Sequence, residues 1–507
     1  MDDVLEVDVA VVGAGNAAMC AAFAAQESGA SVIVLERAPH AECGGNSAFT
    51  GGATRFAFHN IDEAREVLDL TDEEVANADF GTYTESDFLE DMGRLTQYRC
   101  DPDLTELFVR ESRRTLAWMK SRGVRFEPMW TRQAQKVNGK YKFYGGLICE
   151  TWGAGQGLVE SLHTIAAKNG IPVHYETCAT KLVYEDGEVR GVVAEAHGKP
   201  LRIRAGAVVL ACGGFESNAE MRARYLGPNW DLVKVRGTRF NMGDGIRMAL
   251  EIGAMPAGHW SGAHAVGWEL NAPAFGEREI GDLFQKHSYP YGIMVNANGE
   301  RFVDEGADFR GFTYAKYGVE VLKQPGMFAW QIFDSKVTHL LRHEYQIRKI
   351  TKVQAATLEE LVQKLEGVNG ARCLDTVRQF NQAVRQEVPF NALVLDGRGT
   401  AGLHVPKSNW ANTIDTPPFH AYAITCGITF TFGGVRVSPK AAVQSVAGRD
   451  LPGLYAAGEM LGGLFYFNYP SGTGLVSGAV FGRIAGIEAA GHALRNRTSR
   501  PASSAAR

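Results

Sequence analysis

The chain has 507 residues, of which 45% are hydrophobic and 21% charged, and its formal net charge is −5 at pH 7. This length is sufficient for two or more structural units with sizeable cores. Nucleic-acid-binding proteins present a basic face, which the net negative charge disfavours, so we expect no nucleic-acid partner.

The apolar runs of the chain are short. The longest, such as residues 205–212, fall well below the ~20 residues that a membrane helix requires. The start, Met1-Asp2-Asp3, has the wrong charge for a signal peptide. We therefore predict no membrane span and a cytoplasmic protein.

The first informative motif follows a predicted strand at residues 7–12 and consists of Gly13, Ala14, Gly15, Asn16, Ala17 and Ala18. Gly13 permits a tight turn, and Gly15 lets a pyrophosphate approach the backbone at a helix N-terminus. A second predicted strand at residues 31–35 ends at Glu36, which is placed to accept hydrogen bonds from a ribose 2′-hydroxyl. This spacing predicts a dinucleotide cradle.

Further glycine-rich segments favour FAD over NAD, because they can lie against a large flat ring system. The loop after the acid contains Gly44, Gly45, Asn46, Ser47, Gly51 and Gly52. Later segments contribute Ala211, Gly213, Gly214, Asp244, Gly458, Glu459, Ser471, Gly474 and Leu475. The predicted cofactor contacts also include Arg37 and Ala179.

We predict that FAD is bound non-covalently, because the loop around Asn46 contains no histidine and the closest one, His59, lies beyond Gly52. The eight cysteines form no C-x-x-C pair, so local spacing assembles neither a zinc site nor an iron–sulfur cluster, and we predict no metal. Electrons from a reduced flavin must then leave to an external acceptor or a redox partner protein.

Organisation along the chain is predicted from periodicity. Alternating strands and helices up to residue 52 indicate a parallel α/β start. Acidic amphipathic patterns, for example at residues 104–122, predict a helical insertion at about 61–145. A tight turn between residues 180–184 and 189–194 predicts a hairpin of the cofactor domain.

These segments together resemble the flavoprotein subunit family of succinate dehydrogenase and fumarate reductase, from about residue 7 to about residue 490. The segments most similar to the soluble tricarballylate dehydrogenases are residues 13–18, 44–47, 299–306, 427–432 and 480–486. Residues 468–472, Asn-Tyr-Pro-Ser-Gly, are similar instead to flavin-dependent 3-ketosteroid dehydrogenases.

The resemblance implies an α/β fold in which a cap is inserted into a discontinuous domain. We expect a Rossmann-like FAD-binding domain at residues 1–254 and 403–490 and an α+β cap domain at 255–402. Within the cap we predict a strand at 292–296 and helices near 358–365 and 371–387. The arginine-rich tail, residues 491–507, is expected to be disordered.

The reaction implied by the resemblance removes or adds two hydrogens across a C–C bond next to a carbonyl or carboxylate of a small molecule. In the ketosteroid enzymes the tyrosine corresponding to Tyr469 donates to the substrate carbonyl, and here Gly472 or Gly474 can supply a second, backbone donor. Ser471 is either a proton relay and flavin contact or only a helix cap. Tyr469 itself is alternatively an ordinary core tyrosine.

Fumarate reductases carry a proton-donating arginine shortly after the stretch that residues 299–305 resemble. Arg310 lies one position away from the place of that arginine. It is either an acid–base group or carboxylate clamp, or else a salt bridge of the cap. Tyr314 or Tyr317 is a candidate base if the substrate is a ketone. His264 takes the place of a substrate-contacting histidine in the family, or is a buried structural group.

Two departures from the fumarate reductases make the predicted pocket more apolar. Phe430 stands where they place a substrate-binding histidine, and Tyr469 where they place a carboxylate-binding arginine. An unpaired buried carboxylate is costly, so succinate and fumarate are disfavoured. The overall resemblance favours a tricarballylate-like substrate, whereas the apolar pocket favours a cyclic or steroid-like ketone. The alternative that is not an enzyme is a flavin-binding electron carrier without a substrate of its own.

Overall fold

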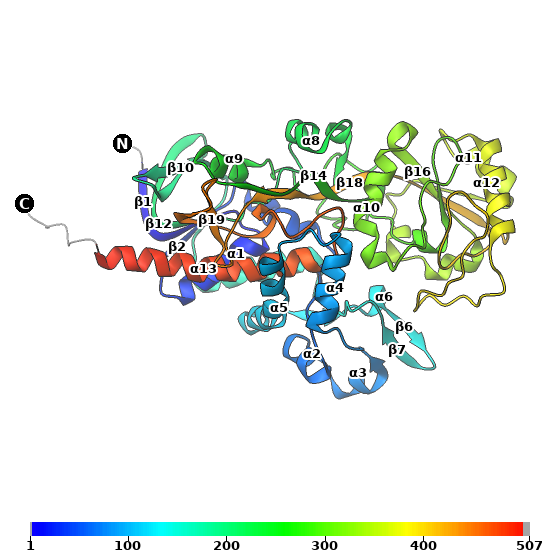
Figure 1. Ribbon diagram of the computed structural model, residues 1–507, viewed down its shortest axis with the longest axis horizontal. Helices are drawn as coiled ribbons and strands as arrows, with labels where there is room; N and C mark the ends of the chain where they lie inside the picture. Colours follow the sequence, from blue (N-terminus) through cyan, green and yellow to red (C-terminus); the bar gives the residue numbers. More distant parts are fainter. Residues whose placement is uncertain (1–2, 500–507) are drawn as a thin grey trace, which may run out of the picture.

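The computed structural model describes residues 3–499, and two large sheets organise them (Figure 1). The first sheet has eight strands in the order β10-β11-β12-β1-β2-β9, with β20 joined to β12 and β19 to β20. Its strands are β1 (Asp3–Val12), β2 (Val32–Leu35), β9 (Val173–His174), β10 (Thr177–Glu185), β11 (Glu188–Ala196), β12 (Lys199–Leu210), β19 (Ala442–Gln444) and β20 (Asp450–Ala456).

The centre of this sheet is parallel and covered on both faces. Strand β1 pairs in parallel with β2 and with β12, and its residues Val9 and Ala10, which point to opposite faces, are both fully buried. The predicted parallel α/β start is confirmed, as are the first two strands. Strands β10 and β11 form the predicted antiparallel hairpin, and β11 joins it to the same sheet through β12.

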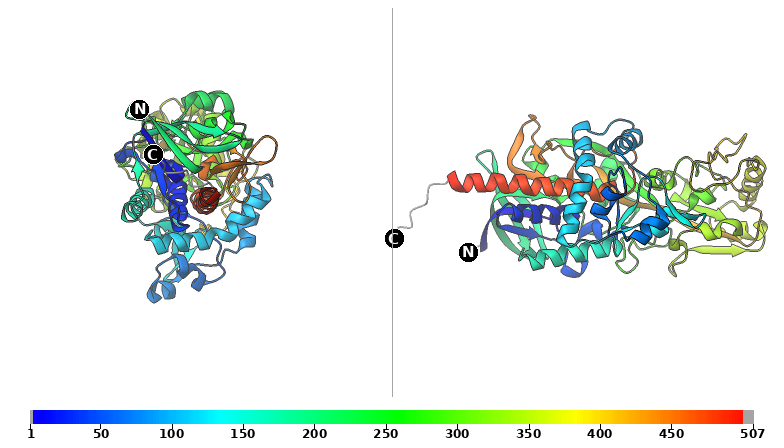
Figure 2. Two further views of the ribbon diagram at one scale, coloured as in Figure 1. Left: turned by 90° about the vertical axis from the view of Figure 1, so that its left-hand side faces the viewer. Right: turned by 90° about the horizontal axis from the view of Figure 1, so that it is seen from below.

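Helix α13 (Thr473–Ser499) lies beside α1 (Asn16–Glu27), as the view from below shows (Figure 2). Glycine makes this contact possible: a Cβ at Gly482 would lie 2.3 Å from the carbonyl oxygen of Ala17, and one at Gly486 would lie 2.2 Å from that of Ala21. Any larger residue at either position must push the helices apart. The two helices therefore bring the start of α13 to the end of β1.

The predicted disordered tail is wrong for residues 491–499, which continue helix α13. The reason is packing that composition does not reveal. Ala493 is buried against Gly206, and His492 Nε2 lies 2.7 Å from Glu188 Oε1 of β11. Residues 500–507 of the predicted tail lie outside the described residues.

The second sheet has six strands, with β18 at its centre. Its strands are β13 (Lys234–Val235), β14 (Pro256–Glu269), β15 (Ile293–Val295), β16 (Phe328–Phe333), β17 (Lys352–Ala355) and β18 (Phe419–Val435). The sequence assigned residues 419–435 to the FAD-binding domain, yet β18 pairs with β14, β16 and β17 of the predicted cap segment. The domain boundaries remain a prediction, but one strand serves both regions.

Several helices surround the second sheet and the edge of the first. They are α7 (Ala154–Lys168), α8 (Ala219–Leu226), α9 (Asp244–Glu251), α10 (Tyr314–Leu322), α11 (Leu358–Lys364) and α12 (Gly370–Ala383). Helix α12 was predicted to reach residue 387 but ends at Ala383, because Val384 bridges Thr400 and the N–H of Arg385 donates to Gly399. The predicted strand at 292–296 is β15, and the helix at 358–365 is α11.

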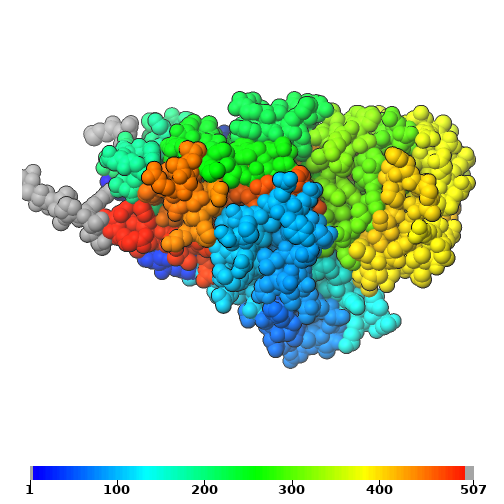
Figure 3. All heavy atoms as spheres, in the orientation of Figure 1, coloured from blue at the N-terminus to red at the C-terminus, as the bar shows by residue number. Residues whose placement is uncertain are grey.

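The helical insertion projects from the body below the cap segment (Figure 3). It contains α2 (Ile61–Val67), α3 (Asp72–Asn77), α4 (Glu85–Leu95), α5 (Pro102–Arg122), α6 (Trp130–Gln133) and the small sheet of β4 (Ala78–Asp79), β6 (Ala134–Val137) and β7 (Lys140–Phe143). Strands β3 (Ala53–Thr54), β5 (Phe126–Pro128) and β8 (Cys149–Thr151) connect it to the body.

Helix α5 corresponds to the predicted helix at 104–122. It begins where the Asp101 carboxylate accepts the N–H of Leu104 and ends at Gly123, whose φ is 113°. Its Trp118 ring lies under the Arg483 guanidinium of α13 at 5.1 Å. Across residues 3–499, no helix combines the length and the apolar character that crossing a bilayer requires.

Candidate functional site

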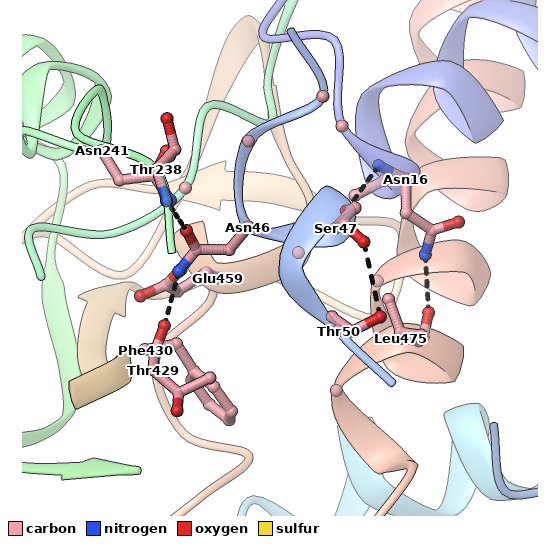
Figure 4. A pocket seen from close by; sticks show the side chains of 18 of the residues that line it. Asn16, Asn46, Ser47, Thr50, Thr238, Asn241, Thr429, Phe430, Glu459 and Leu475 are labelled. Atoms are coloured by element: carbon pink, nitrogen blue, oxygen red, sulfur yellow. Dashed lines mark hydrogen bonds between the residues drawn. The ribbon is translucent and has the colours of Figure 1, made fainter. Parts of the chain in front are cut away.

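One cavity gathers the glycine-rich segments, and most of the predicted cofactor residues line it (Figure 4). They are Gly13, Gly15, Asn16, Ala17, Glu36, Arg37, Gly44, Gly45, Asn46, Ser47, Gly51, Ala179, Ala211, Gly213, Asp244, Gly458, Glu459, Ser471, Gly474 and Leu475. These residues come from segments up to 462 positions apart, between Gly13 and Leu475. The fold thus brings together what the sequence could show only as separate motifs.

The turn between β1 and α1 has the geometry of a pyrophosphate cradle. Gly13 has a φ of 104°, and a Cβ there would lie 2.4 Å from the carbonyl oxygen of Ala211. Gly15 is the N-cap of α1 and adds no side chain at the start of the helix, where the backbone N–H groups of a first turn suit an anion.

Glu36 lies at the end of β2, as the motif predicts. Its Oε2 accepts the N–H of Ala14 at 3.1 Å, and its Oε1 accepts that of Ala38 at 2.8 Å. Burial raises the pKa of this carboxyl, while the backbone donors oppose the shift. Beside it, Arg37 forms a 2.5 Å ion pair with Asp244 at the start of α9.

Asn46 connects the loop after Glu36 to both sides of the cavity (Figure 4). Its Nδ2 donates to Glu216 Oε1 at 2.7 Å and to the carbonyl oxygen of Thr429 in β18 at 2.6 Å. Its Oδ1 accepts the N–H of Thr238 at 2.9 Å. Both the amide nitrogen and the amide oxygen of this side chain are therefore bonded to protein groups, which fixes the loop.

The same loop is tied to the two helices. Ser47 Oγ accepts the N–H of Asn16 at 3.0 Å, and Asn16 Nδ2 donates to the carbonyl oxygen of Leu475 at 2.8 Å (Figure 4). The starts of α1 and α13 and the loop thus form one hydrogen-bonded unit. A flat ring placed against this unit would meet backbone and small side chains.

Two buried carboxyls, Glu216 and Glu459, lie behind the loop. Asn241 Nδ2 donates to Glu216 Oε1 at 2.5 Å, and the N–H of Thr431 donates to Glu459 Oε1 at 2.7 Å. Burial raises the pKa of both groups, and the neighbouring Glu459 charge raises that of Glu216 further. Sequence reasoning missed Glu216, although it lies only two residues after Gly214.

Three predicted cofactor residues do not line the cavity, and their small size serves packing instead. Ala18 is fully buried in α1. A Cβ at Gly52 would lie 2.9 Å from Ala154 Cα, and one at Gly214 would lie 2.1 Å from Glu459 Oε1.

The cap side of the cavity presents two tyrosines. The hydroxyls of Tyr314 in α10 and Tyr469 before α13 lie 2.7 Å apart, and both side chains are buried. Burial, and then the proximity of Tyr314, raises the pKa of Tyr469 well above its ordinary value, so its hydroxyl remains a neutral donor. Both predicted tyrosines line the cavity.

His264 does not line the cavity but packs against the tyrosine pair from behind. Its ring lies 5.0 Å from that of Tyr314 and 4.8 Å from that of Tyr469, and it stacks on Phe430 at 5.2 Å. It is fully buried, and neither ring nitrogen has a hydrogen-bond partner among the described residues. Burial, reinforced by Arg236, lowers its pKa well below the ordinary value and keeps the ring neutral.

Of the three other predicted catalytic residues, two line the cavity and one does not. Arg310 and Ser471 line the cavity, and the N–H of Ser471 donates to the carbonyl oxygen of Gly311 at 2.9 Å. Tyr317 does not line it, because its hydroxyl donates to the carbonyl oxygen of Asp304.

Charged residues that sequence reasoning missed complete the cap side of the cavity. Arg236 is buried and forms an ion pair with Asp282, and its Nη1 donates to Thr429 Oγ1 at 3.1 Å. Arg342 lines the same cavity. No motif surrounds these residues in the sequence, so only their convergence in the fold identifies them.

The residues present fit FAD. The glycine cradle and the start of α1 suit a pyrophosphate, Glu36 suits a ribose, and the loop at Asn46 offers a small-residue surface for the flavin ring. The tyrosine pair lines the same cavity as the cradle, so a substrate bound there can meet the ring.

Comparison with known proteins agrees with this geometry. Residues 8–475 match the family model described as FAD binding domain. A probable fumarate reductase of Shewanella frigidimarina is 29% identical over 489 residues, which cover 96% of this chain and 75% of that protein. A 3-oxosteroid 1-dehydrogenase of Mycobacterium tuberculosis is 26% identical, and the match covers 97% of this chain and 99% of that protein.

Among solved structures, the open conformation of a flavocytochrome c3 fumarate reductase superposes with a TM-score of 0.72 at 27% identity, covering 97% of this chain and 79% of that one. The predicted α/β fold, the FAD cofactor and the oxidoreductase class are confirmed. The chain belongs to the FAD binding domain family and, within it, to the flavoproteins of the succinate dehydrogenase and fumarate reductase type.

Proposed function

We propose that this enzyme transfers a hydride between FAD and a C–C bond adjacent to a carbonyl or carboxylate. The observation that carries the proposal is the hydroxyl pair of Tyr314 and Tyr469, 2.7 Å apart, in the wall of the cavity that also contains the cofactor cradle. Such a reaction needs a donor that polarises the carbonyl and a group that handles the proton of the neighbouring carbon. The pair supplies both functions within one hydrogen bond.

The roles follow from the environments of the two hydroxyls. FAD, when bound, supplies the hydride acceptor or donor. Tyr469, kept neutral by burial, donates to the carbonyl oxygen, and Gly472 or Gly474 adds a backbone donor from the same turn. Tyr314 moves the proton to or from the carbon next to that carbonyl. Arg310 and Ser471 bind or orient the substrate, and His264 holds the tyrosine rings in place.

We propose a tricarballylate-like carboxylic acid as the first substrate candidate. Arg310 lines the cavity beside Tyr314, with its guanidinium carbon 5.4 Å from the ring centroid, which suits a carboxylate next to the reacting bond. The similarity to a fumarate reductase supports a carboxylic acid as well.

A cyclic or steroid-like 3-ketone is the second candidate, and a different observation favours it. Phe430, Phe432 and Phe465 line the cavity near Tyr469, so much of its wall is aromatic and apolar. The similarity to a 3-oxosteroid 1-dehydrogenase supports this class. In either case the electrons leave the reduced flavin to an external acceptor.

Anaerobic mixing of the FAD-loaded enzyme with each compound tests the proposal. Loss of the long-wavelength flavin absorbance with tricarballylate supports the first candidate, and loss with a 3-ketosteroid supports the second. An electron carrier without its own substrate would show neither, and its flavin would still be reduced by an electron-donating protein. Loss of bleaching in Tyr469→Phe would assign the chemistry to the tyrosine pair.

A further inference from the structure

A second, outer cavity lies between the helical insertion and the cap segment. It shares Arg132, Arg310 and Arg342 with the FAD cavity, so the two are contiguous. Its walls come from α6 and β6 on one side and from the segments around Arg310 and Arg342 on the other. Contact between the sides is direct, because Arg310 Nη2 lies 3.4 Å from Gln133 Oε1 of α6.

The charged side chains that line this cavity, among the described residues, are all basic. Its lining includes Arg132, Lys136, Arg310, His339, Arg342 and His343, and among the described residues that line it there is no Asp or Glu. The chain as a whole carries a net charge of −5, so this enrichment is local. A cavity of one sign concentrates ligands of the opposite charge.

Arg310 and Arg342 are the cations at the junction of the two cavities. Arg132 is already paired with Glu150. No carboxylate pairs with Arg310 among the described residues, and its guanidinium contacts the neutral amide of Gln133 and the ring face of Tyr314. Arg342 has Glu344 at 3.5 Å from its Nε, and this nitrogen makes no hydrogen bond among the described residues.

The two guanidinium groups destabilise each other. Burial, and then the positive charge of Arg342, lowers the pKa of Arg310 to about 10. Two cations held near each other in a partly buried site are stabilised when an anion lies between them. His287 lines the same cavity with 2% exposure, and neither of its ring nitrogens has a hydrogen-bond partner among the described residues. It adds a neutral donor to the site.

We propose that the outer cavity binds a carboxylate between Arg310 and Arg342, with His287 as a further donor. The planar guanidinium matches a carboxylate, which can accept two parallel N–H bonds. Arg310 lies against Tyr314, so a carboxylate bound there belongs to a molecule whose reacting bond reaches the tyrosine pair. This inference rests on the proposed function and extends it: the substrate is an organic acid with a carboxylate directed toward the insertion.

Binding of malonate to the FAD-loaded protein tests this site without turnover. Malonate carries carboxylates and has no C–C bond that can be dehydrogenated, and neutral malonamide is its matched control. Titration by calorimetry and by flavin difference absorbance, at constant ionic strength, should show saturable binding of malonate and none of malonamide. Binding of both compounds with equal affinity, or of neither, overturns the proposal.

Three variants assign the binding to these residues. Arg310→Gln and Arg342→Gln should each weaken malonate binding about tenfold or more, as expected for loss of a charged hydrogen-bonded partner. Arg348→Gln, an exposed change in the same segment, should leave the affinity unchanged. FAD content and the thermal midpoint report whether each variant is folded. Unchanged malonate affinity in folded Arg310→Gln and Arg342→Gln proteins overturns the assignment.

Malonate binding and flavin bleaching by a substrate can succeed or fail independently of each other. If malonate binds through both arginines but no candidate substrate bleaches the flavin, the anion site stands and the proposed reaction falls. If a neutral 3-ketosteroid bleaches the flavin and malonate does not bind, the reaction stands and the anion site falls.

Discussion

The hydroxyl oxygens of Tyr314 and Tyr469 are hydrogen-bonded at 2.7 Å, although Tyr314 belongs to α10 and Tyr469 to the turn before α13. Neither segment alone could hold this geometry. The backbone around Tyr469 is anchored to the cap by Ser471, whose N–H donates to Gly311, and by Asn468, whose Nδ2 donates to Phe312 at 2.7 Å. The pair therefore forms only when the two segments are docked.

Replacing either hydroxyl tests its role. Tyr469→Phe and Tyr314→Phe should each lower turnover by about 10²- to 10⁴-fold, the range that a positioned acid–base group contributes. FAD content should be unchanged, because neither hydroxyl belongs to the glycine cradle at the start of α1. Tyr317→Phe is the matched control and should retain turnover, since Tyr317 does not line the cavity. Equal activity in all three variants would contradict the proposed mechanism.

Asn46 provides a test of cofactor binding. Asn46→Ala removes the bonds to Glu216, Thr429 and Thr238, so the loop loses its anchors. FAD affinity, measured by titrating the deflavinated protein, should fall about tenfold or more. Asn381→Ala also removes side-chain bonds, two to the backbone of Ile414, and should leave FAD affinity unchanged because neither residue lines the cavity.

The contact between α1 and α13 predicts opposite effects for two glycines of one helix. Gly482→Val should destabilise the protein strongly, because its Cβ would lie 2.3 Å from the backbone oxygen of Ala17. Gly491→Ala should stabilise it by about 0.5–1 kcal/mol, since the nearest atom is the end of the flexible Arg495 side chain at 3.2 Å. Thermal midpoints measure both. A neutral Gly482→Val would show that the helices can separate without cost.

His287 should make the protein acid-labile. Burial lowers its pKa well below the ordinary value, and the neighbours that lower it further are Arg310, Arg236, Arg342 and His264. Below the unfolded pKa of about 6.5, the unfolded state binds a proton that the folded state does not, so stability falls as the pH falls.

The thermal midpoint should therefore drop between pH 7.5 and 5.5, and it should drop less in His287→Leu. The exposed His197→Leu should follow the wild-type curve. If His287→Leu loses as much stability as wild type over this range, the neutral state of His287 does not limit acid stability.

The mode of flavin attachment is also testable. The loop at Asn46 carries no histidine, and His59 is exposed and lies 3.1 Å from Glu63 and 3.2 Å from Glu85. Acid precipitation of the FAD-loaded protein should release all flavin into the supernatant. Yellow colour that remains in the pellet after washing would demonstrate a covalent bond.

The dinucleotide cradle was predictable because its residues lie close together in the sequence. The turn at Gly13, the helix start at Gly15 and the acid at Glu36 lie within one βαβ unit, where spacing alone determines geometry. The same holds for the hairpin of β10 and β11, which needs only a tight turn between two alternating strands.

The partners of these residues were not predictable, because they depend on distant chain segments. Asn46 binds Thr429, 383 positions away, and no motif marks Glu216, Arg342 or His287 as part of a site. The disordered-tail prediction failed for a related reason. Composition describes Ala493 as a small residue near arginines, whereas the fold gives it Gly206 to pack against.

Strand β18 physically connects the predicted cap segment to the loop at Asn46. Its residues near Ala421 pair with β16 and β17, while Thr429 and Thr431, farther along the same strand, hold Asn46 and Glu459. A strand paired along this length is stiff. A shift of β16 and β17 relative to the first sheet would therefore be transmitted along β18 to the loop at Asn46.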